Sequence, residues 1–473
     1  MIPLSPDLHA AYLHDESQFV GTASHIAFPA TPDALLAEIL AARAADLPIT
    51  PQGARTALTG SGVPVTPHGL LLSCERLAGV TPLPPLPDGT PLLRVLPGTR
   101  LSDLRAACPP GWFFPTDPTE PSATLGGMIS TNASGARSFR YGPVRSHVRA
   151  LTLIPPYYPD LPPAPLALRR TLPPPRPVVK TAAGYCLDAA DPIDLYIGSE
   201  GTLAIIADAT LALTPVPAAI SALFILVPDA PDLPLPALRD LPDIAAIEYF
   251  DAPSLALLHA HGHLAPLLPH APPADSAALC IEFHSASPDA AEAAAAATYD
   301  LLSAALPLPL PDASLLATTP RELDVLRTFR HALPETVNSI VAEHKKANPA
   351  LTKLATDFAV PPAALPDLLR TYRADLREAR LPYVTFGHIG DAHLHLNLLP
   401  DRPEHLPIAR DLIHRWAARV TALGGSLSAE HGIGKLKRPL FLAHTPSARL
   451  DRLAAVKNAH DPRHLLNPGT LLP

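Results

Sequence analysis

Three glycine-rich stretches in the first half of the chain restrict what that half can fold into and hold. They are 51–62 (PQGARTALTGSG), 124–135 (TLGGMISTNASG) and 197–202 (IGSEGT). Backbone N–H groups bind phosphate best where no side chain blocks the approach, and glycine removes that block. Neither GxGxxG nor a GxxxxGK motif followed by Ser or Thr occurs, so a Rossmann site and a Walker site are both poorly supported. Three such loops together favour an extended cofactor that carries phosphate.

A helix and several short strands are expected around these loops. Residues 31–48 predict a helix, because Thr31 can cap it and Pro32 fits its first turn. Its predicted apolar stripe consists of Leu35, Leu36, Ile39 and Leu40. Strand-like runs follow at 69–74, 92–98 and 149–154. The proline-rich run 155–177 is interpreted as a surface loop.

The second half of the chain, from about residue 217, has a different pattern. Apolar, strand-like runs alternate there with Ala- and Leu-rich helical segments. The runs are 222–228, 244–250 and 278–284, and the helical segments are 287–307 and 361–382. This alternation predicts an α+β domain in which helices cover a sheet. A last helix is expected at 406–425, closed by Gly424.

Charge and cysteine content exclude several classes of function. The net charge of -8 and the pI near 6.2 provide no basic face for nucleic acid. No CxxC pair occurs, which argues against a cysteine-bound zinc or iron–sulfur centre. The four cysteines are Cys74, Cys108, Cys186 and Cys280. Without a signal peptide pattern or a long apolar run, we expect a cytoplasmic protein with no transmembrane segment, with peripheral attachment to a membrane as a second option.

Three histidines crowd into residues 386–400 (FGHIGDAHLHLNLLP). They are His388, His393 and His395. Gly390 and Asp391 suit a two-residue hairpin turn, and in that register the first histidine faces the second. Because side chains alternate along a strand, the second and third histidines share a face. All three imidazoles are therefore expected to point the same way.

A divalent ion such as zinc would need two or three of these imidazoles and a carboxylate. The stretch AEHGIG near the C-terminus offers Glu430 as that carboxylate, with His431 beside it. From these residues alone, a metal site is one alternative and ordinary polar residues on a strand are the other.

Taken in order, the motifs resemble those of one family, the FAD-linked oxidases and dehydrogenases of the vanillyl-alcohol oxidase superfamily, with its PCMH-type FAD-binding domain. The resemblance runs from about Phe19 to the C-terminus. Its most specific parts are PQGARTALTGSGVP, ATLGGMISTNASGARSFRYG, IGSEGTLAII, GHIGDAHLHLN, AEHGIGK and NPG. Within the superfamily the chain is similar to the branch of cytochrome-type D-lactate dehydrogenase, the flavin subunit of glycolate oxidase and D-2-hydroxyglutarate dehydrogenase.

The resemblance implies an α+β fold in three parts. Residues 1–217 would form the PCMH-type FAD-binding domain, and residues 218–425 a substrate (cap) domain with an antiparallel sheet. Residues 426–473 would return to the FAD-binding domain and complete the active site.

The resemblance also implies noncovalent FAD, because covalent relatives attach it through a histidine in the first loop and this loop has none. The first loop would hold the pyrophosphate, and the other two would surround the rest. Arg55 stands where many relatives have glycine, and either a phosphate contact or a solvent-facing side chain would suit it. The implied FAD-binding residues are Gln52, Gly53, Ala54, Arg55, Thr56, Gly60, Ser61, Thr124, Gly126, Gly127, Ser130, Asn132, Gly135, Gly201, Ile206 and, near the flavin, Asn467.

For the chemistry, the resemblance implies a divalent metal, zinc before manganese or iron, on His388, His395 and Glu430. His431 would be the catalytic base, and Arg330 would bind the carboxylate of a small 2-hydroxy acid. A metal lowers the pKa of a bound hydroxyl, and a histidine with an ordinary pKa of about 6.5 can take the proton. The α-hydrogen would pass as hydride to the flavin.

Two positions bear on the choice of substrate. Relatives specific for 2-hydroxyglutarate carry a threonine, here replaced by Pro334, and a lysine, whose place is taken by Ala355. Lys353 lies two residues earlier and would share a strand face with that position, so it is a further candidate catalytic residue. The exchange favours D-lactate or glycolate. His393 stands where asparagine is common, and it could be a metal ligand, a substrate contact or a bystander.

In the dehydrogenase interpretation, electrons leave the flavin to a quinone, a cytochrome or a separate iron–sulfur subunit. Three alternatives compete with this interpretation. A flavin-dependent alkyl transferase resembling alkylglycerone-phosphate synthase would carry histidine at the position of Glu430. A zinc hydrolase would leave the glycine-rich half unexplained. A catalytically inactive binding protein is disfavoured because the candidate ligands and base are all intact.

Overall fold

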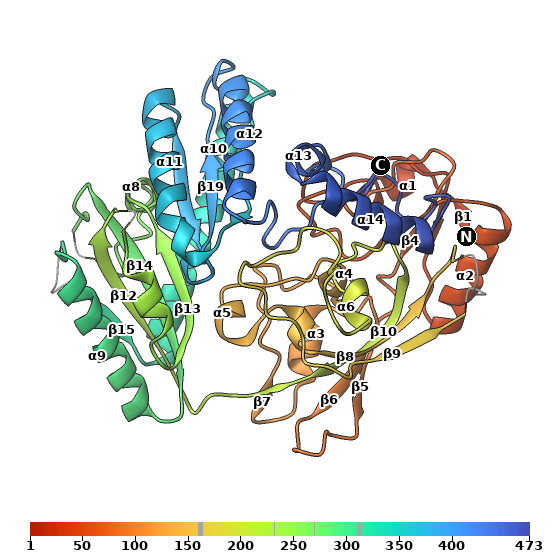
Figure 1. The fold of residues 1–473 in the computed structure, drawn as a ribbon, viewed down its shortest axis with the longest axis horizontal. Coiled ribbons are helices and arrows are strands. Elements are labelled where there is room, and N and C mark those ends of the chain that lie inside the picture. The colour runs from red at the N-terminus through yellow and green to blue at the C-terminus, as the bar shows by residue number, and fades with distance from the viewer. Residues whose placement is uncertain (159–163, 231, 269, 310–313) are drawn as a thin grey trace.

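The computed structural model describes residues 1–158, 164–230, 232–268, 270–309 and 314–473. The chain forms two lobes (Figure 1). The first lobe combines three small sheets from the N-terminal half with the C-terminal segment, and the second lobe is built on one large sheet. None of the helices in these ranges combines the length and the apolar character that a membrane crossing requires.

A four-stranded sheet supports the first glycine-rich loop, which follows β3. Its order is β1 (Ile2–Pro3), β2 (His25–Ala27), β4 (Leu70–Ser73) and β3 (Ile49–Gln52). Strands β2 and β3 both run parallel to β4, so the chain must cross over between them, and helix α2 (Pro32–Ala44) makes that crossing.

Helix α2 begins where predicted but buries a different stripe. Thr31 caps it by accepting a hydrogen bond from the Ala34 N–H at 3.2 Å. Its buried residues are Leu35, Ile39 and Ala42. Leu36 and Leu40 of the expected stripe lie about 100° further around the helix, and Leu40 is 44% exposed. Leu36 is partly buried against the same core, so Leu40 is the one residue of the predicted stripe that lies outside it, and Ala42 completes the buried face.

A five-stranded antiparallel sheet supports the other two glycine-rich loops. Its order is β5 (Val80–Leu83), β6 (Leu92–Val95), β10 (Ile205–Ala212), β8 (Val148–Ile154) and β9 (Leu166–Arg169). A two-stranded sheet pairs β7 (Trp112–Phe113) with β11 (Thr214–Pro215). The short helices of this half are α1 (Pro6–His9), α3 (Leu101–Ala106), α4 (Leu125–Ser130), α5 (Ser138–Tyr141) and α6 (Ile193–Tyr196). The third glycine-rich loop leads directly into β10, and the second contains α4.

Strand β9 corrects one expectation. It lies inside the run 155–177 that was predicted to be a surface loop, of which 159–163 fall outside the described residues. The strand pairs with β8, and its residues alternate between half-buried and exposed. Because it is an edge strand with only one packed face, four residues that alternate between half-buried and exposed are enough to form it, even among prolines.

The large sheet has eight strands in an antiparallel arrangement. Its order is β15 (Leu315–Ala317), β12 (Ala219–Pro228), β14 (Ser276–Ser285), β13 (Ile244–Phe250), β18 (Tyr383–Gly387), β19 (His393–Leu398) and β16 (Leu354–Ala355), with β17 (Phe358–Ala359) also paired to β19. The expected antiparallel sheet of an α+β fold is therefore confirmed.

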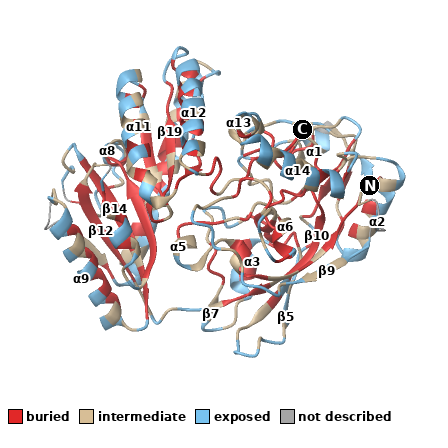
Figure 2. Ribbon diagram, viewed as in Figure 1, coloured by how far each residue is buried: buried red, intermediate tan, exposed pale blue. Residues whose placement is uncertain are grey.

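Helices cover the large sheet on both faces. The helices α7 (Leu235–Arg239), α9 (Pro288–Ala305), α11 (Leu365–Ala379) and α12 (His405–Ala422) share one core with the sheet, and α8 (Ala252–Ala260) and α10 (Pro320–Ala347) share the other. The central strands are buried along most of their length, as Figure 2 shows. Burial on both faces explains why these strands are nearly continuous apolar runs in the sequence.

The C-terminal segment returns to the first lobe, as expected. Helices α13 (Arg438–His444) and α14 (Ser447–His460) lie beside that lobe in Figure 1. Beyond them the chain runs along β3, where the Ile49 N–H donates to Leu465 O at 2.8 Å and the Asn467 N–H donates to Ile49 O at 2.7 Å.

A buried charge cluster in the first lobe makes a stability prediction. Asp194 Oδ1 lies 2.9 Å from Arg145 and 2.7 Å from Arg170, and these side chains are 1–7% exposed. Asp194→Ala would leave two buried guanidinium groups unpaired, so urea unfolding should show a loss of about 3–5 kcal/mol in the free energy of unfolding. The control is Asp367→Ala, whose exposed pair with Arg370 should cost about 0–1 kcal/mol. Equal losses in the two variants would contradict the prediction.

Candidate active site

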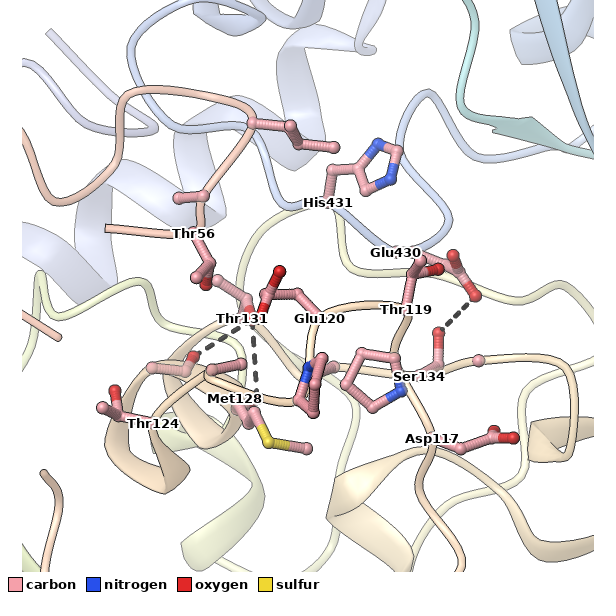
Figure 3. Close-up of a pocket in the computed structure, with 18 of the residues that line it drawn as sticks. Thr56, Asp117, Thr119, Glu120, Thr124, Met128, Thr131, Ser134, Glu430 and His431 are labelled. Carbon is pink, nitrogen blue, oxygen red and sulfur yellow. Dashed lines mark hydrogen bonds between the residues drawn. The ribbon is translucent and has the colours of Figure 1, made fainter. Parts of the chain in front are cut away.

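One cavity of about 920 Å³ gathers most of the residues singled out in the sequence. The three glycine-rich loops line one side of it, and residues of β13, β14, β18, β19 and α10 line the other. Figure 3 shows Thr56 of the first loop and Thr124 of the second with Glu430 and His431 around this space. The implied FAD-binding residues that line it are Gln52, Gly53, Ala54, Arg55, Thr56, Ser61, Thr124, Gly126, Gly127, Ser130, Gly135, Gly201, Ile206 and Asn467.

Close packing requires glycine at several loop positions. A Cβ on Gly53 would lie 2.2 Å from Thr124 Oγ1, and one on Gly126 would lie 2.6 Å from Pro97. Thr124 Oγ1 is buried and has no hydrogen-bond partner among the described residues. A buried hydroxyl of this kind needs a partner, and an oxygen atom of a bound cofactor would provide one. The residues of these loops therefore fit FAD.

Two of the implied FAD-binding residues shape the loops and are not among the described residues that line the cavity. Gly60 has a φ of 69° and lies against the Phe19 ring. Asn132 has a φ of 52°, accepts from the Arg145 N–H at 3.4 Å and donates to Thr181 O at 3.4 Å. The positive φ angles of both residues set the course of the loop backbone.

Arg55 reaches the cavity wall but is engaged elsewhere. Its guanidinium lies 3.3 Å from Glu75 Oε2 and 4.5 Å from the centre of the Tyr12 ring. The guanidinium therefore has a carboxylate partner while it lines the cavity, and a phosphate contact of Arg55 stays a prediction.

Asn467 ties the first loop to the third. Its Nδ2 donates to Ser61 O at 2.9 Å and to Glu200 O at 2.8 Å, and its Oδ1 accepts from Lys435 at 3.1 Å. Burial lowers the pKa of Lys435 to about 7 and raises the pKa of Glu200 to about 7. Glu200 and Lys435 were not predicted as site residues, although both lie inside motifs that were quoted for the resemblance.

The histidine hairpin brings three imidazoles together. Strands β18 and β19 pair in the register that places His388 opposite His393, as predicted. The connection is a 3-10 turn at Ile389–Asp391 followed by a residue with positive φ, which is longer than the expected two-residue turn. The His388 ring lies 5.5 Å from that of His393 and 5.6 Å from that of His395, and the last two are 4.5 Å apart.

Glu430 completes a group with the composition of a metal site. Its Oε1 lies 3.3 Å from His388 Nε2, and its Oε2 lies 3.8 Å from His395 Nε2. Candidate ligand atoms of these three residues and of His393 all lie within 4.8 Å of one another. Zinc takes imidazole and carboxylate ligands at about 2.0–2.2 Å, so ligand atoms at these separations fit a divalent ion.

Three residues that were not predicted from the sequence contact this group. His388 Nδ1 lies 2.7 Å from Glu248 Oε1, which leaves Nε2 facing Glu430. Lys180 donates to Glu430 Oε1 at 2.6 Å, and Ser134 donates to the same oxygen at 2.9 Å (Figure 3). A carboxylate on the far nitrogen of a ligating histidine is a recurrent support of metal sites.

The two carboxylates are ionised despite their burial. Burial alone would raise the pKa of Glu248, but His388 and Arg330 lower it to about 2. Burial would likewise raise the pKa of Glu430, but Lys180 and His388 hold it well below its ordinary value. Glu430 is therefore available as an anionic ligand at neutral pH.

His431 lines the cavity beside the metal group. Its ring stacks on that of His395, with centroids 5.5 Å apart and planes at 18°. Burial lowers the pKa of both imidazoles below the ordinary value, so both are neutral at neutral pH. His393 differs: it is fully buried, is not among the described lining residues, and its Nε2 lies 2.9 Å from Asp357 Oδ1.

Helix α10 presents Arg330 to the cavity, where its Nη2 lies 3.3 Å from Glu248 Oε2. Arg327, His331 and Pro334 of the same helix also line the cavity. Lys353 does not reach it: within the described chain it is not a lining residue, and its Nζ donates to Asn338 Oδ1 at 2.8 Å. It precedes β16 at the edge of the sheet, so a strand face shared with Ala355 does not bring it to the cavity.

Comparison with known proteins agrees with this arrangement. Residues 229–471 match the sequence model of a family described as FAD linked oxidases, C-terminal domain, and residues 23–156 match one described as FAD binding domain. The chain is 30% identical over 456 residues to D-2-hydroxyglutarate dehydrogenase of Xanthomonas citri pv. viticola (94% of this chain, 88% of the relative). It is 29% identical over 482 residues to D-lactate dehydrogenase of Anaerostipes hadrus (98% and 93%).

The fold is shared with a solved protein of low sequence identity. A structure of alkyldihydroxyacetonephosphate synthase superposes with a TM-score of 0.63 at 16% identity, covering 94% of this chain and 75% of that one. The two family matches together span most of the chain and carry the assignment. The chain belongs to the FAD-linked oxidases.

Proposed function

We propose that this FAD-linked oxidase is a dehydrogenase that converts a D-2-hydroxy acid, D-lactate or glycolate, into the 2-oxo acid. The observation that carries the proposal is the composition of the single cavity described above. One wall is made of the FAD-binding loops, and the other carries Arg330, His431 and the group of His388, His395 and Glu430. Two relatives bear the names of 2-hydroxy acid dehydrogenases, which supports the reaction class.

The loops would hold FAD without a covalent bond, since the first loop contains no histidine. FAD supplies the acceptor for the hydride equivalent of the substrate α-hydrogen. Electrons would then leave to an external quinone, a cytochrome or a separate iron–sulfur subunit, because the cysteines are too dispersed in the sequence to hold an iron–sulfur centre.

His388, His395 and Glu430 would hold the divalent ion, with zinc preferred over manganese or iron for this donor set. Such an ion supplies a Lewis acid for the substrate hydroxyl. Arg330 would bind the substrate carboxylate through its guanidinium fork. His431, stacked beside His395, would take the hydroxyl proton. The acid thus gives up one proton and one hydride equivalent.

The surroundings of Arg330 favour a short acid. A second carboxylate, as in 2-hydroxyglutarate, would need another cation. Lys353 is bound to Asn338 outside the described cavity lining. The other arginines that line the described cavity already have partners: Arg55 with Glu75, Arg105 with Thr116 O, Arg137 with Glu282 and Arg327 with Asp324.

An alkyl transfer like that of alkyldihydroxyacetonephosphate synthase is the second candidate. The shared fold favours it, but similarity at 16% identity concerns the fold alone. The transferase branch carries a histidine at the position of Glu430, so the carboxylate favours the metal-dependent dehydrogenases.

The reaction is tested most simply by anaerobic absorption spectroscopy. Mixing the yellow protein with D-lactate or glycolate in the absence of any acceptor should bleach the flavin absorption. L-lactate is the stereochemical control and D-2-hydroxyglutarate the control for length, and both should act at least about tenfold more slowly. Retention of the full yellow colour with every D-2-hydroxy acid would contradict the proposal.

Arg330→Met should raise the KM for the 2-hydroxy acid by about 10²-fold, because a buried charge pair with the substrate carboxylate is lost. The matched control is Arg321→Met, an exposed arginine at the start of α10 that is not among the described cavity-lining residues, and its KM should change by less than about threefold. Steady-state kinetics with an artificial acceptor measures both. A KM for Arg330→Met equal to that of the parent protein would refute the assignment.

Metal content separates the roles of the histidines. His395→Asn removes a cavity-facing ligand and should lose the ion, whereas His393→Asn should keep it, because His393 faces Asp357 behind the cavity wall. Elemental analysis after loading with one equivalent of zinc and gel filtration measures this. Loss of zinc from both variants would make His393 a ligand.

A further inference from the structure

Asp357 is a buried carboxylate to which the proposed mechanism assigns no role. It lies between β16 and β17 and is 2% exposed. Its two oxygens meet two histidines: Oδ2 lies 3.3 Å from His431 Nδ1, and Oδ1 lies 2.9 Å from His393 Nε2. One carboxylate therefore contacts both the proposed base and the histidine behind the metal group.

The carboxylate is fixed by further donors around Oδ2. The backbone N–H of His431 donates to Oδ2 at 3.0 Å. Ser428 Oγ and Lys437 Nζ each donate to the same oxygen at 2.7 Å. Lys437 balances the buried charge, and the backbone contact anchors the segment that carries His431. Asp357 thus contacts both the backbone and the ring of His431.

This 3.3 Å contact favours one of the two ring nitrogens of His431 as the free one. A neutral imidazole has one N–H and one lone pair, and a carboxylate beside Nδ1 selects the form in which Nδ1 carries the hydrogen. The lone pair is then on Nε2, the nitrogen turned away from Asp357. Without the carboxylate, either form would be populated and the ring could rotate.

We infer that Asp357 is the positioning residue of the base: it holds His431 with Nδ1 protonated and Nε2 ready to accept the substrate proton, while its other oxygen lies 2.9 Å from His393 Nε2. This inference rests on the proposed function, in which His431 takes that proton. The alternative is a purely structural role, in which Asp357 only anchors Ser428 and Lys437. The test must distinguish this role from the positioning of His431.

The test measures the rate of anaerobic flavin reduction at saturating D-lactate or glycolate, which needs no knowledge of the electron acceptor. Asp357→Asn keeps the volume and removes the charge, and it should slow reduction by about 10²-fold with KM, FAD content and zinc content close to those of the parent. Ser428→Ala removes another donor to the same oxygen and should slow reduction by less than about fivefold.

A double variant shows whether the effect passes through His431. His431→Gln should slow reduction by about 10²–10⁴-fold, and His431→Gln with Asp357→Asn should be no slower than His431→Gln alone. Multiplying effects, or an Asp357→Asn rate within about threefold of the parent, would overturn the inference. A parent-like rate in His431→Gln would overturn the proposed function itself, which distinguishes the two failures.

A second measurement does not depend on the folding of Asp357→Asn. Nitrogen-15 NMR of the histidine-labelled holoenzyme, with the His431 signals assigned from His431→Gln, reports which ring nitrogen carries the hydrogen. A protonated Nδ1 and an unprotonated Nε2 are expected. The opposite pattern would overturn the inference even if every variant lost activity.

Discussion

The carboxylate of Glu430 is the point at which the N-terminal half, the large sheet and the C-terminal segment meet. Its Oε1 accepts from Lys180 at 2.6 Å and from Ser134 at 2.9 Å, and it lies 3.3 Å from His388 Nε2. A buried carboxylate is tolerated only when its charge and lone pairs are matched. Because its partners come from different parts of the chain, the metal group can form only when those parts are assembled against the FAD-binding loops.

Other polar contacts also join the two lobes. Arg137 next to α5 donates to Glu282 of β14 at 2.7 Å, Glu282 lies 2.7 Å from His284 Nε2, and Tyr141 lies 2.6 Å from His284 Nδ1. Such contacts are directional, whereas apolar packing alone tolerates sliding. The spacing between the cofactor loops and the substrate-facing wall therefore depends on hydrogen-bond geometry.

Local patterns predicted what depends on local geometry. The period of two along β19 placed His393 and His395 together, the capping residue placed the start of α2, and the glycines marked the loops that line the cavity. What failed depended on weak local signals. Ala42 took the place expected for Leu40 in the buried stripe of α2, and β9 was hidden among prolines.

Long-range partners could not be predicted. Lys180 reaches Glu430 across 250 residues of sequence, and Glu248 reaches His388 across 140, through contacts that only the assembled lobes create. Asp357 gave no signal either, since a single aspartate in a strand-like segment resembles many exposed ones. For Lys353, strand alternation predicted a face but not the position of that strand at the edge of the sheet, where its Nζ donates to Asn338 Oδ1.

The most direct test of the central claim, one cavity that joins flavin, metal and substrate, is anomalous diffraction from crystals of the zinc-loaded flavoprotein grown with the 2-oxo acid product. One zinc peak bounded by His388, His395 and Glu430 is expected, with the product carboxylate on Arg330 and the flavin between these groups and the three glycine-rich loops. A zinc peak elsewhere, or product bound away from Arg330, would contradict the claim.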